Sequence, residues 1–187
     1  MKTALNEDHS FSFFEQLSKK LRGQIIDLSY NGRAAHLGSC LSCIDILTIL
    51  YWKYLNINVN DPFNINRDRL ILSKGHAAMA LYACLAEKGI IKKSELKTFN
   101  KNNGRLSEHP PADMVPGIEA GTGSLGHGFS IGLGIALSGL IKNLNYHVYA
   151  IIGDGELNEG SIWEGALFAS SQNLNNFTVF IDSNKWQ

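Results

Sequence analysis

The sequence predicts an α/β fold in which helices cover both faces of a largely parallel sheet. A strand–helix–strand pattern over residues 147–181 and a short apolar run at 69–73, set between helical patterns, support this prediction. Glycine, proline, asparagine and aspartate separate the segments, as is usual for turns. Because 187 residues are enough for one substantial core, we expect a single domain over 1–187 with a flexible stretch at 1–12.

The N-terminal half is predicted to be mainly helical. Apolar residues recur at helical spacing from Phe11 to Tyr30, and Ser10 or Ser12 could cap this helix. Four further elements are expected in order: a helix at about 40–55, a buried strand at 69–73, an alanine-rich helix that ends near 88, and a short helix at 94–100.

A long segment without periodicity, residues 101–125, precedes the C-terminal elements. Loops of this length in compact domains are usually functional or disordered. A glycine-tolerant helix follows at 126–144, and its glycines suggest close backbone packing against a neighbour. The final strand, helix and strand, at 147–152, 161–174 and 177–181, form a βαβ unit, so the two strands should be parallel and adjacent.

The composition narrows the class of protein. Lysine plus arginine and aspartate plus glutamate number 17 each, which argues against a nucleic-acid-binding protein. No stretch approaches the length and apolarity of a membrane span, and the N-terminus lacks a signal-peptide pattern. The CxxC spacing of Cys40 and Cys43 has no second pair to complete a zinc site, so we expect these thiols and Cys84 to be buried in a reducing, cytoplasmic protein.

Oxygen-bearing residues follow both strands of the βαβ unit. Asp154 stands between Gly153 and Gly155 after the first strand, and Asn184 follows the second. Ligands of open α/β sheets bind beyond the carboxyl ends of the strands, and the glycines allow a phosphate to approach the backbone closely. Mg²⁺ commonly combines one or two protein oxygens with substrate phosphates. Each motif alone is also a common turn, but together they favour a Mg²⁺–diphosphate site.

These motifs resemble the thiamine-diphosphate signature, and the chain from about residue 13 onward resembles the N-terminal, diphosphate-binding part of the transketolase family. Several separated stretches agree with that family in order and spacing: His36-Leu-Gly38, Asn66-Arg-Asp-Arg69, Ser73-Lys-Gly-His76, His109-Pro110, Gly121-Thr-Gly-Ser-Leu-Gly126, Gly153-Asp154-Gly155, Glu159-Gly160 and Asn184.

The resemblance implies a role for individual residues in binding the cofactor. Asp154 and Asn184 would bind Mg²⁺ (or Ca²⁺), with the backbone carbonyl of Trp186 as a third protein ligand. Gly155 and Glu156 would lie along the diphosphate. The segment Gly123, Ser124 and Leu125 would cradle the thiamine part of thiamine diphosphate.

The resemblance also implies catalytic and interface residues. His76 would lie near the diphosphate and the reaction centre, and His36 and His109 would line the sugar channel. Glu159 and Glu164 would connect paired cofactor sites across a subunit interface. An imidazole moves protons near neutral pH, although a histidine at the end of an element is often structural. Glu159 could instead favour a helix N-terminus through the helix dipole.

The other three histidines are interpreted without the resemblance. His127 could pack on its helix or lie beside the cofactor loop, and His9 and His147 are taken as incidental.

The implied function is that of the N-terminal subunit of a thiamine-diphosphate- and Mg²⁺-dependent transketolase. Such an enzyme moves a two-carbon ketol unit from a ketose, or its phosphate, to an aldose, as in the pentose phosphate pathway. The resemblance implies an oligomer, a dimer at least, and a C-terminal partner subunit that carries the pyrimidine-binding domain. Family members with separate N-terminal subunits continue further, so the fold is expected to be incomplete at the C-terminal end. A deoxyxylulose-phosphate-synthase-type enzyme and a truncated, non-catalytic fragment are alternatives.

Two segments depart from the family pattern. The usual Gly-His-Pro-Gly is Ala35-His36-Leu37-Gly38 here, and Glu108-His109-Pro110 replaces the commoner Gly-His-Pro. Both departures flank histidines that the resemblance places beside the substrate, so unusual donor and acceptor sugars are expected.

Overall fold

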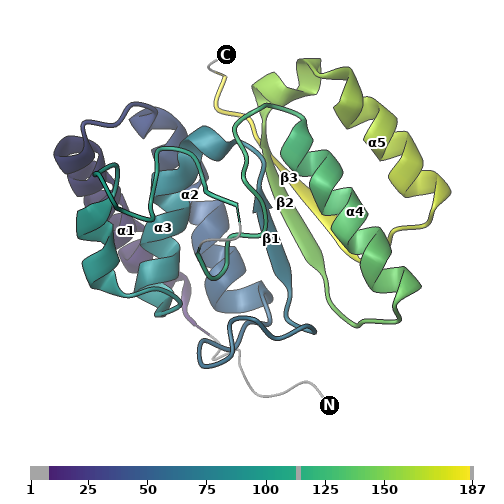
Figure 1. The fold of residues 1–187 in the computed structure, drawn as a ribbon, viewed down its shortest axis with the longest axis horizontal. Helices are drawn as coiled ribbons and strands as arrows, with labels where there is room; N and C mark the ends of the chain where they lie inside the picture. Colours follow the sequence, from purple (N-terminus) through teal and green to yellow (C-terminus); the bar gives the residue numbers. More distant parts are fainter. Residues whose placement is uncertain (1–8, 113–114, 186–187) are drawn as a thin grey trace.

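The computed structural model describes residues 9–112 and 115–185 and has three layers (Figure 1). A parallel sheet of three strands lies between helices α1–α3 on one side and α4–α5 on the other. The predicted α/β class, with helices on both faces of a parallel sheet, is confirmed.

The three strands are β1 (Arg69–Leu72), β2 (Val148–Gly153) and β3 (Phe177–Asp182). Their order is β1-β2-β3, and both pairings are parallel. The expected adjacency of the two C-terminal strands is therefore confirmed. The register pairs Gly153 with Asp182, so the exits of β2 and β3 lie at the same level of the sheet.

The larger part of the core lies between the sheet and the first helical layer. This layer contains α1 (Phe11–Gly32), α2 (Leu37–Ile49) and α3 (Ala78–Lys88). Helix α1 begins inside the stretch 1–12, and the Ser10 hydroxyl caps it by accepting a hydrogen bond from the backbone N–H of Phe13 at 3.2 Å. A π-helical turn, η1 (Leu50–Tyr54), extends α2.

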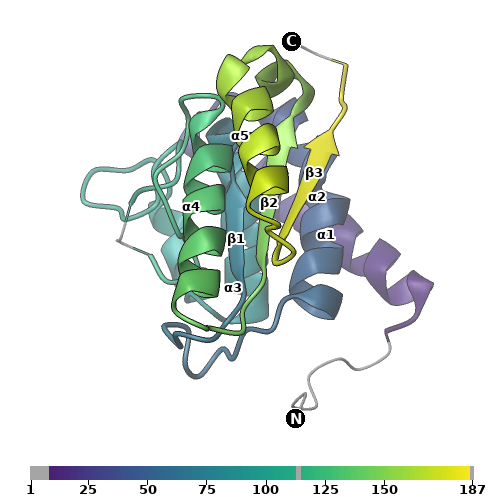
Figure 2. The ribbon, with the colours of Figure 1, turned by 90° about the vertical axis from the view of Figure 1, so that its right-hand side faces the viewer.

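The second helical layer contains α4 (His127–Ile141) and α5 (Gly160–Ser171), which lie side by side over the sheet (Figure 2). The glycines of α4 allow the close approach that the sequence predicted, but to the chain's own sheet. A Cβ on Gly128 would lie 2.6 Å from the Cα of Ser73. No larger residue fits there without displacing the end of β1.

Three short 3₁₀ segments complete the fold: η2 (Gly75–Ala77), η3 (Lys93–Thr98) and η4 (Asp154–Asn158). The short helix predicted at 94–100 is thus a 3₁₀ helix that begins one residue earlier. Glu95 stabilises its start, since one carboxylate oxygen accepts a hydrogen bond from the backbone N–H of Lys92 at 3.2 Å.

The long segment between η3 and α4 has no helix or strand among its described residues, but side chains anchor it. Arg67 forms a two-point ion pair with Glu119, and the Thr122 hydroxyl donates to the carbonyl of Leu72 at 2.7 Å. The ion pair fixes the segment at the start of β1, and the Thr122 bond fixes it at the carboxyl end of that strand.

The three cysteines are buried and free, as the sequence predicted. Burial raises the pKa of the Cys40 thiol to about 11 and that of Cys43 to about 12. These thiols are therefore protonated at neutral pH and pack as small apolar residues. Within residues 9–112 and 115–185, no helix has the length and apolarity needed to cross a membrane.

Candidate functional site

The carboxyl ends of the three strands bring four separate segments together. Residues 73–76 follow β1, residues 153–156 begin at the last residue of β2, and residues 182–185 begin at the last residue of β3. The loop 121–126 leads into α4 beside them. Figure 2 shows β2 and β3 ending at the same end of the molecule. All predicted cofactor residues within the described part of the chain belong to these segments.

Asp154 and the exit of β3 are in direct contact. One carboxylate oxygen of Asp154 accepts a hydrogen bond from the backbone N–H of Lys185 at 2.9 Å. Lys185 follows Asn184, so the two residues predicted to bind the metal stand on neighbouring strand exits. Trp186, the predicted third ligand, lies outside the described residues.

The Glu156 carboxylate joins three of these segments. One of its oxygens accepts hydrogen bonds from the Ser73 hydroxyl at 2.5 Å and from the N–H of Gly126 at 2.9 Å. The other accepts from the N–H of Gly153 at 2.9 Å. Glu156 is only 1% exposed. If this residue lies along the diphosphate, as predicted, its backbone rather than its side chain would make the contact.

A buried ion pair lies beneath the same edge. The Lys74 ammonium group, fully buried, pairs with one oxygen of Asp182 and donates to the carbonyl of Ser39 at 3.2 Å. The second oxygen of Asp182 accepts from the Ser42 hydroxyl at 2.6 Å. Asp182, although it ends β3 as Asp154 follows β2, therefore links the sheet to α2 and does not face a metal.

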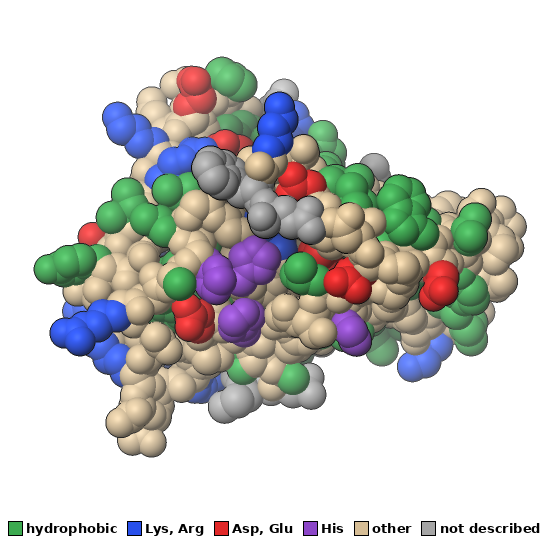
Figure 3. All heavy atoms as spheres, turned by 90° about the horizontal axis from the view of Figure 1, so that it is seen from above, with side chains coloured by type: hydrophobic (Ala, Val, Ile, Leu, Met, Phe, Trp, Pro, Cys, Tyr) green, Lys and Arg blue, Asp and Glu red, His purple; other side chains and the backbone are tan. Residues whose placement is uncertain are grey.

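Three histidines from distant parts of the chain form a cluster above the strand ends. The ring centroid of His36 lies 5.2 Å from that of His76 and 6.1 Å from that of His109. Figure 3 shows histidine side chains gathered on this surface. The three residues predicted to be catalytic are thus brought together, with His36 and His109 exposed and His76 half-buried.

Local structure fixes two of these histidines. His36 immediately precedes α2 and has the left-handed conformation, with φ 65° and ψ 21°, which turns the chain sharply into the helix. His109 packs on Gly123, whose φ is +150° and where an added Cβ would lie 2.8 Å from the imidazole Cδ2. A residue larger than glycine at 123 would displace His109.

Tyr82 of α3 holds the loop that carries His109. Its hydroxyl donates to the carbonyl of Ser107 at 2.8 Å and reaches the carbonyl of His109 at 3.3 Å. The Ser107 hydroxyl donates to the same His109 carbonyl at 2.7 Å. Sequence reasoning missed Tyr82 because it lies on an alanine-rich buried helix, where an aromatic residue indicates only packing.

We expect His76 to stay neutral in the folded protein at neutral and mildly acidic pH. Burial, followed by the positive charges of Lys74, His36 and His109, lowers the pKa of His76 from 6.5 to about 4. Between these two pH values the unfolded chain binds more protons at this residue, so the contribution of His76 makes the fold less stable as the pH falls. A ¹H–¹⁵N NMR titration of the ring nitrogens measures this pKa, and a midpoint near 6.5 would contradict the expectation.

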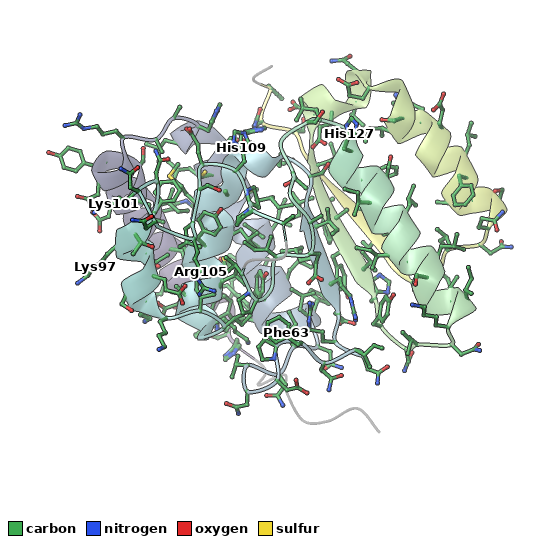
Figure 4. The ribbon with its side chains drawn as sticks, in the orientation of Figure 1. Phe63, Lys97, Lys101, Arg105, His109 and His127 are labelled. Atoms are coloured by element: carbon green, nitrogen blue, oxygen red, sulfur yellow. The ribbon has the colours of Figure 1, made fainter. Side chains whose placement is uncertain are left out.

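The loop predicted to hold thiamine, residues 123–125, lies directly before α4 and contacts its first residue. Ser124 is exposed and its carbonyl accepts the N–H of His127 at 3.3 Å. The ring Nδ1 of His127 lies 3.2 Å from the carbonyl of Leu125. His127 therefore lies beside the loop that is predicted to hold thiamine, at the same end of the molecule as His109 (Figure 4).

The other two histidines have structural contacts. His9 stacks on Phe13 with ring centroids 3.9 Å apart, and His147 Nε2 lies 2.8 Å from the hydroxyl oxygen of Thr178. Neither residue belongs to the cluster, in line with the interpretation of both as incidental.

The two predicted interface acids lie at the start of α5. Glu159 immediately precedes the helix, makes no side-chain capping hydrogen bond, and is exposed, as is Glu164. Trp163 and Leu167 on the same helix are 58% and 74% exposed. Exposed apolar and acidic groups thus alternate on one outer surface of α5.

The donor set fits a metal-bound diphosphate. Among residues 9–112 and 115–185 no group of three or more His, Cys, Asp or Glu side chains could hold a metal by itself, so Mg²⁺ would need the phosphate oxygens that it normally recruits. The Ser39 hydroxyl, beside the buried Lys74 pair, is buried without a hydrogen-bond partner among the described residues. A ligand oxygen would satisfy it.

An apolar groove of the described structure lies elsewhere. It has a volume of about 780 Å³ and runs between α5 and the edge strand β3, with apolar side chains such as Phe129, Trp163 and Ile181 in its walls. No histidine lines it, so its chemistry does not match that of the strand-end site.

The domain has a parallel α/β sheet, an aspartate between two glycines at one strand exit and an asparagine at the next, with a histidine cluster nearby. These features define a protein of the class that binds its ligands at the carboxyl edge of the sheet. Residues 15–187 match the family described as transketolase, thiamine diphosphate binding domain. The chain belongs to this family, and the resemblance found in the sequence is confirmed.

Relatives and solved structures agree with this assignment. The chain is 39% identical, over 92% of its length, to a subunit of the apulose-4-phosphate transketolase of Phocaeicola vulgatus, and covers 61% of that protein. It is 43% identical, over 81% of its length, to the 6-deoxy-6-sulfo-D-fructose transketolase subunit SqwG of a Clostridium species, and covers 55% of it. The transketolase of Campylobacter jejuni superimposes with a TM-score of 0.90 at 29% identity, over 96% of this chain and 29% of that one.

Proposed function

We propose that this chain is the thiamine-diphosphate-binding N-terminal subunit, or part of it, of a transketolase that transfers a two-carbon ketol unit from a ketose to an aldose. The observation that carries the proposal is the contact between the Asp154 turn and the Asn184 exit, with the histidine cluster at the same edge. One element of this arrangement alone would be a common turn. Together they provide an anchor for a diphosphate and proton-transferring groups beside it.

The metal is proposed to be Mg²⁺, with Ca²⁺ as a substitute. Asp154 would supply a carboxylate oxygen and Asn184 its amide oxygen, both hard ligands of the type that Mg²⁺ prefers. Gly155, which is partly exposed, would let a phosphate approach the backbone, and the N-terminus of α4 (His127–Ile141) adds a favourable partial positive charge.

The histidines would manage protons and orient the sugar. Thiamine diphosphate, when bound, supplies the nucleophilic carbon that breaks and remakes the carbon–carbon bond. His76, neutral because its pKa is lowered to about 4, can accept a proton or a hydrogen bond at one ring nitrogen. The exposed His36 and His109 can donate to and accept from sugar hydroxyl groups.

A partner subunit with the pyrimidine-binding domain is part of the proposal. The chain spans less than two thirds of the length of its apulose-4-phosphate transketolase relatives, and the names of those relatives, which call each of them a subunit, imply a second chain. The exposed apolar and acidic surface of α5, with Trp163, Glu164 and Leu167, supports an oligomer interface there. The three buried thiols fit a cytoplasmic setting.

The substrates are proposed to be ketoses and aldoses of the phosphorylated type. The names of the two relatives place a phosphate in one substrate and a sulfonate in the other. A pentose phosphate or a related branched or modified sugar is therefore the class to assay first.

The Asp154→Ala variant should lose Mg²⁺-dependent binding of thiamine diphosphate. We expect the affinity to fall more than about a hundredfold, because changes to mere neighbours of metal ligands already cost about 10–100-fold. Isothermal titration calorimetry of the chain with thiamine diphosphate, with Mg²⁺ and with EDTA, measures this loss. Asp27→Ala, which removes an exposed acid of α1, is the control and should bind normally. Equal affinities in Asp154→Ala and the control would contradict the metal assignment.

A further inference from the structure

The two segments that depart from the usual family pattern are in contact with each other. One carboxylate oxygen of Glu108 accepts a hydrogen bond from the backbone N–H of Ala35 at 3.0 Å. Glu108 immediately precedes His109, and Ala35 immediately precedes His36. The bond therefore joins, across 73 positions of sequence, the two chain segments that carry the exposed histidines of the cluster.

Both ends of this connection are otherwise constrained. The Glu108 backbone lies between Ser107 and His109, whose carbonyls are held by Tyr82 of α3. On the other side, His36 adopts the left-handed conformation with φ 65°, which is unusual for a residue other than glycine and persists where its surroundings enforce it. The hydrogen bond of the Glu108 side chain therefore connects the loop that Tyr82 holds with the strained turn at His36.

The Glu108 carboxylate forms no ion pair with a described side chain, and its hydrogen bond places it against the residue that precedes His36. The nearby buried cation, Lys74, is already paired with Asp182. Glu108 is partly exposed and is joined to the Ala35 N–H, so we infer that its charge acts on ligands that approach the chain segments of His36 and His109. An anionic group there would be repelled, whereas a hydroxyl group could donate a hydrogen bond to the carboxylate.

We propose that Glu108 is a positioning and specificity-determining residue, which holds His36 against His109 and selects sugars that present hydroxyl groups, rather than phosphate or sulfonate, to the histidine cluster. The proposal rests on the proposed function, because it assumes that a sugar occupies the cluster. It places the charged end of a sugar phosphate away from these histidines.

Two substitutions at Glu108 separate the effect of its hydrogen bond to Ala35 from the effect of its negative charge. Glu108→Gln keeps the length and an acceptor oxygen for the Ala35 N–H but removes the charge. Glu108→Asp keeps the charge but is one methylene shorter and cannot reach Ala35 from a fixed backbone. Glu15→Gln, at an exposed acid of α1, is the charge-matched control.

The positioning role of Glu108 is tested by measuring, with NMR, the hydrogen exchange of the Ala35 amide in the unliganded chain. We expect Glu108→Asp to exchange about tenfold faster than the wild type, since a hydrogen bond to a charged group is lost, and the His36 signals to shift. Glu108→Gln should retain most of the protection. Unchanged exchange and unchanged His36 signals in Glu108→Asp would overturn the positioning role.

The charge is tested by titrating the same proteins with inorganic sulfate at neutral pH while following the His36 and His109 signals. We expect Glu108→Gln to bind sulfate about two- to fivefold more tightly than the wild type, the size of effect that one exposed charge produces. The control variant should match the wild type. An equal sulfate affinity in Glu108→Gln and the wild type would overturn the selective role.

Neither measurement requires thiamine diphosphate or catalysis. A failure of the Glu108 proposal would therefore appear in exchange rates and sulfate affinity, while a failure of the proposed function would appear in the calorimetry of Asp154→Ala. The two failures are distinguishable.

Discussion

The Glu156→Gln variant should lose about 2–4 kcal/mol of folding stability and most of its affinity for thiamine diphosphate. The carboxylate is 1% exposed and accepts three hydrogen bonds. A glutamine can keep the oxygen that faces Ser73 and Gly126, but its NH₂ group then faces the N–H of Gly153, and two donors meet. Leaving a buried N–H without an acceptor, and losing charge-assisted bonds, each cost about 1–3 kcal/mol. Urea unfolding measures the stability and calorimetry the affinity.

Two further variants sharpen this prediction. Ser73→Ala removes one donor to Glu156 and the acceptor for the N–H of Phe129 at 3.1 Å, so it should cost less than Glu156→Gln but more than an exposed change. Glu15→Gln, at an exposed acid, should be near neutral. Faster amide exchange at both Gly126 and Gly153 in Glu156→Gln would locate the damage. Wild-type stability and exchange in that variant would show that the three segments hold together without it.

Periodicity and turn residues predict most of this fold. The strands around Ile71, Ile151 and Val179 are short apolar runs, and the helical spacing of α1 is plain in the sequence. The runs around Ile71 and Ile151 are buried as expected, whereas β3 is an edge strand that is only partly buried, with Ile181 50% exposed. The parallel pairing of β2 with β3 follows from their short helical connection. The pairing of β1 with β2 could not be predicted in the same way, because the segment that separates them contains a long loop without periodicity.

The sequence predicts residues for the candidate site but does not predict how they are arranged. The motifs identify the oxygens at 154 and 184 and the three histidines, because chemistry at a strand end needs those residue types. No local pattern in the sequence shows that the side chains of Glu156 and Asp182 are buried, while that of Asp154 contacts the residues that follow β3. That difference depends on partners 83 and 108 positions away, Ser73 and Lys74. Long-range pairing of this kind is invisible to local patterns.

The Lys74→Met variant should be destabilised by about 3–5 kcal/mol, because it leaves the Asp182 carboxylate buried without its counter-ion. Lys74 is fully buried, and Asp182 also accepts the Ser42 hydroxyl. The loss of the Lys74 charge removes one of the causes that lower the pKa of His76, so that pKa should rise. Urea unfolding gives the free energy, and the NMR titration of His76 gives the second readout.

A double-mutant cycle distinguishes the ion pair from simple packing. Asp182→Leu alone should also lower the free energy of unfolding, since it leaves the Lys74 ammonium group buried without a counter-ion. The double variant Lys74→Met with Asp182→Leu should lose much less than the sum of the two single losses, because two apolar groups replace two charges. Lys20→Met removes the surface ion pair with Glu87, where Lys20 is 54% exposed, and should cost no more than about 1 kcal/mol. Additive costs in the cycle would mean that Lys74 and Asp182 stabilise the strand ends independently. Coupled costs would mean that β3, α2 and the His76 turn are held by one shared charge pair, which places the exit that carries Asn184.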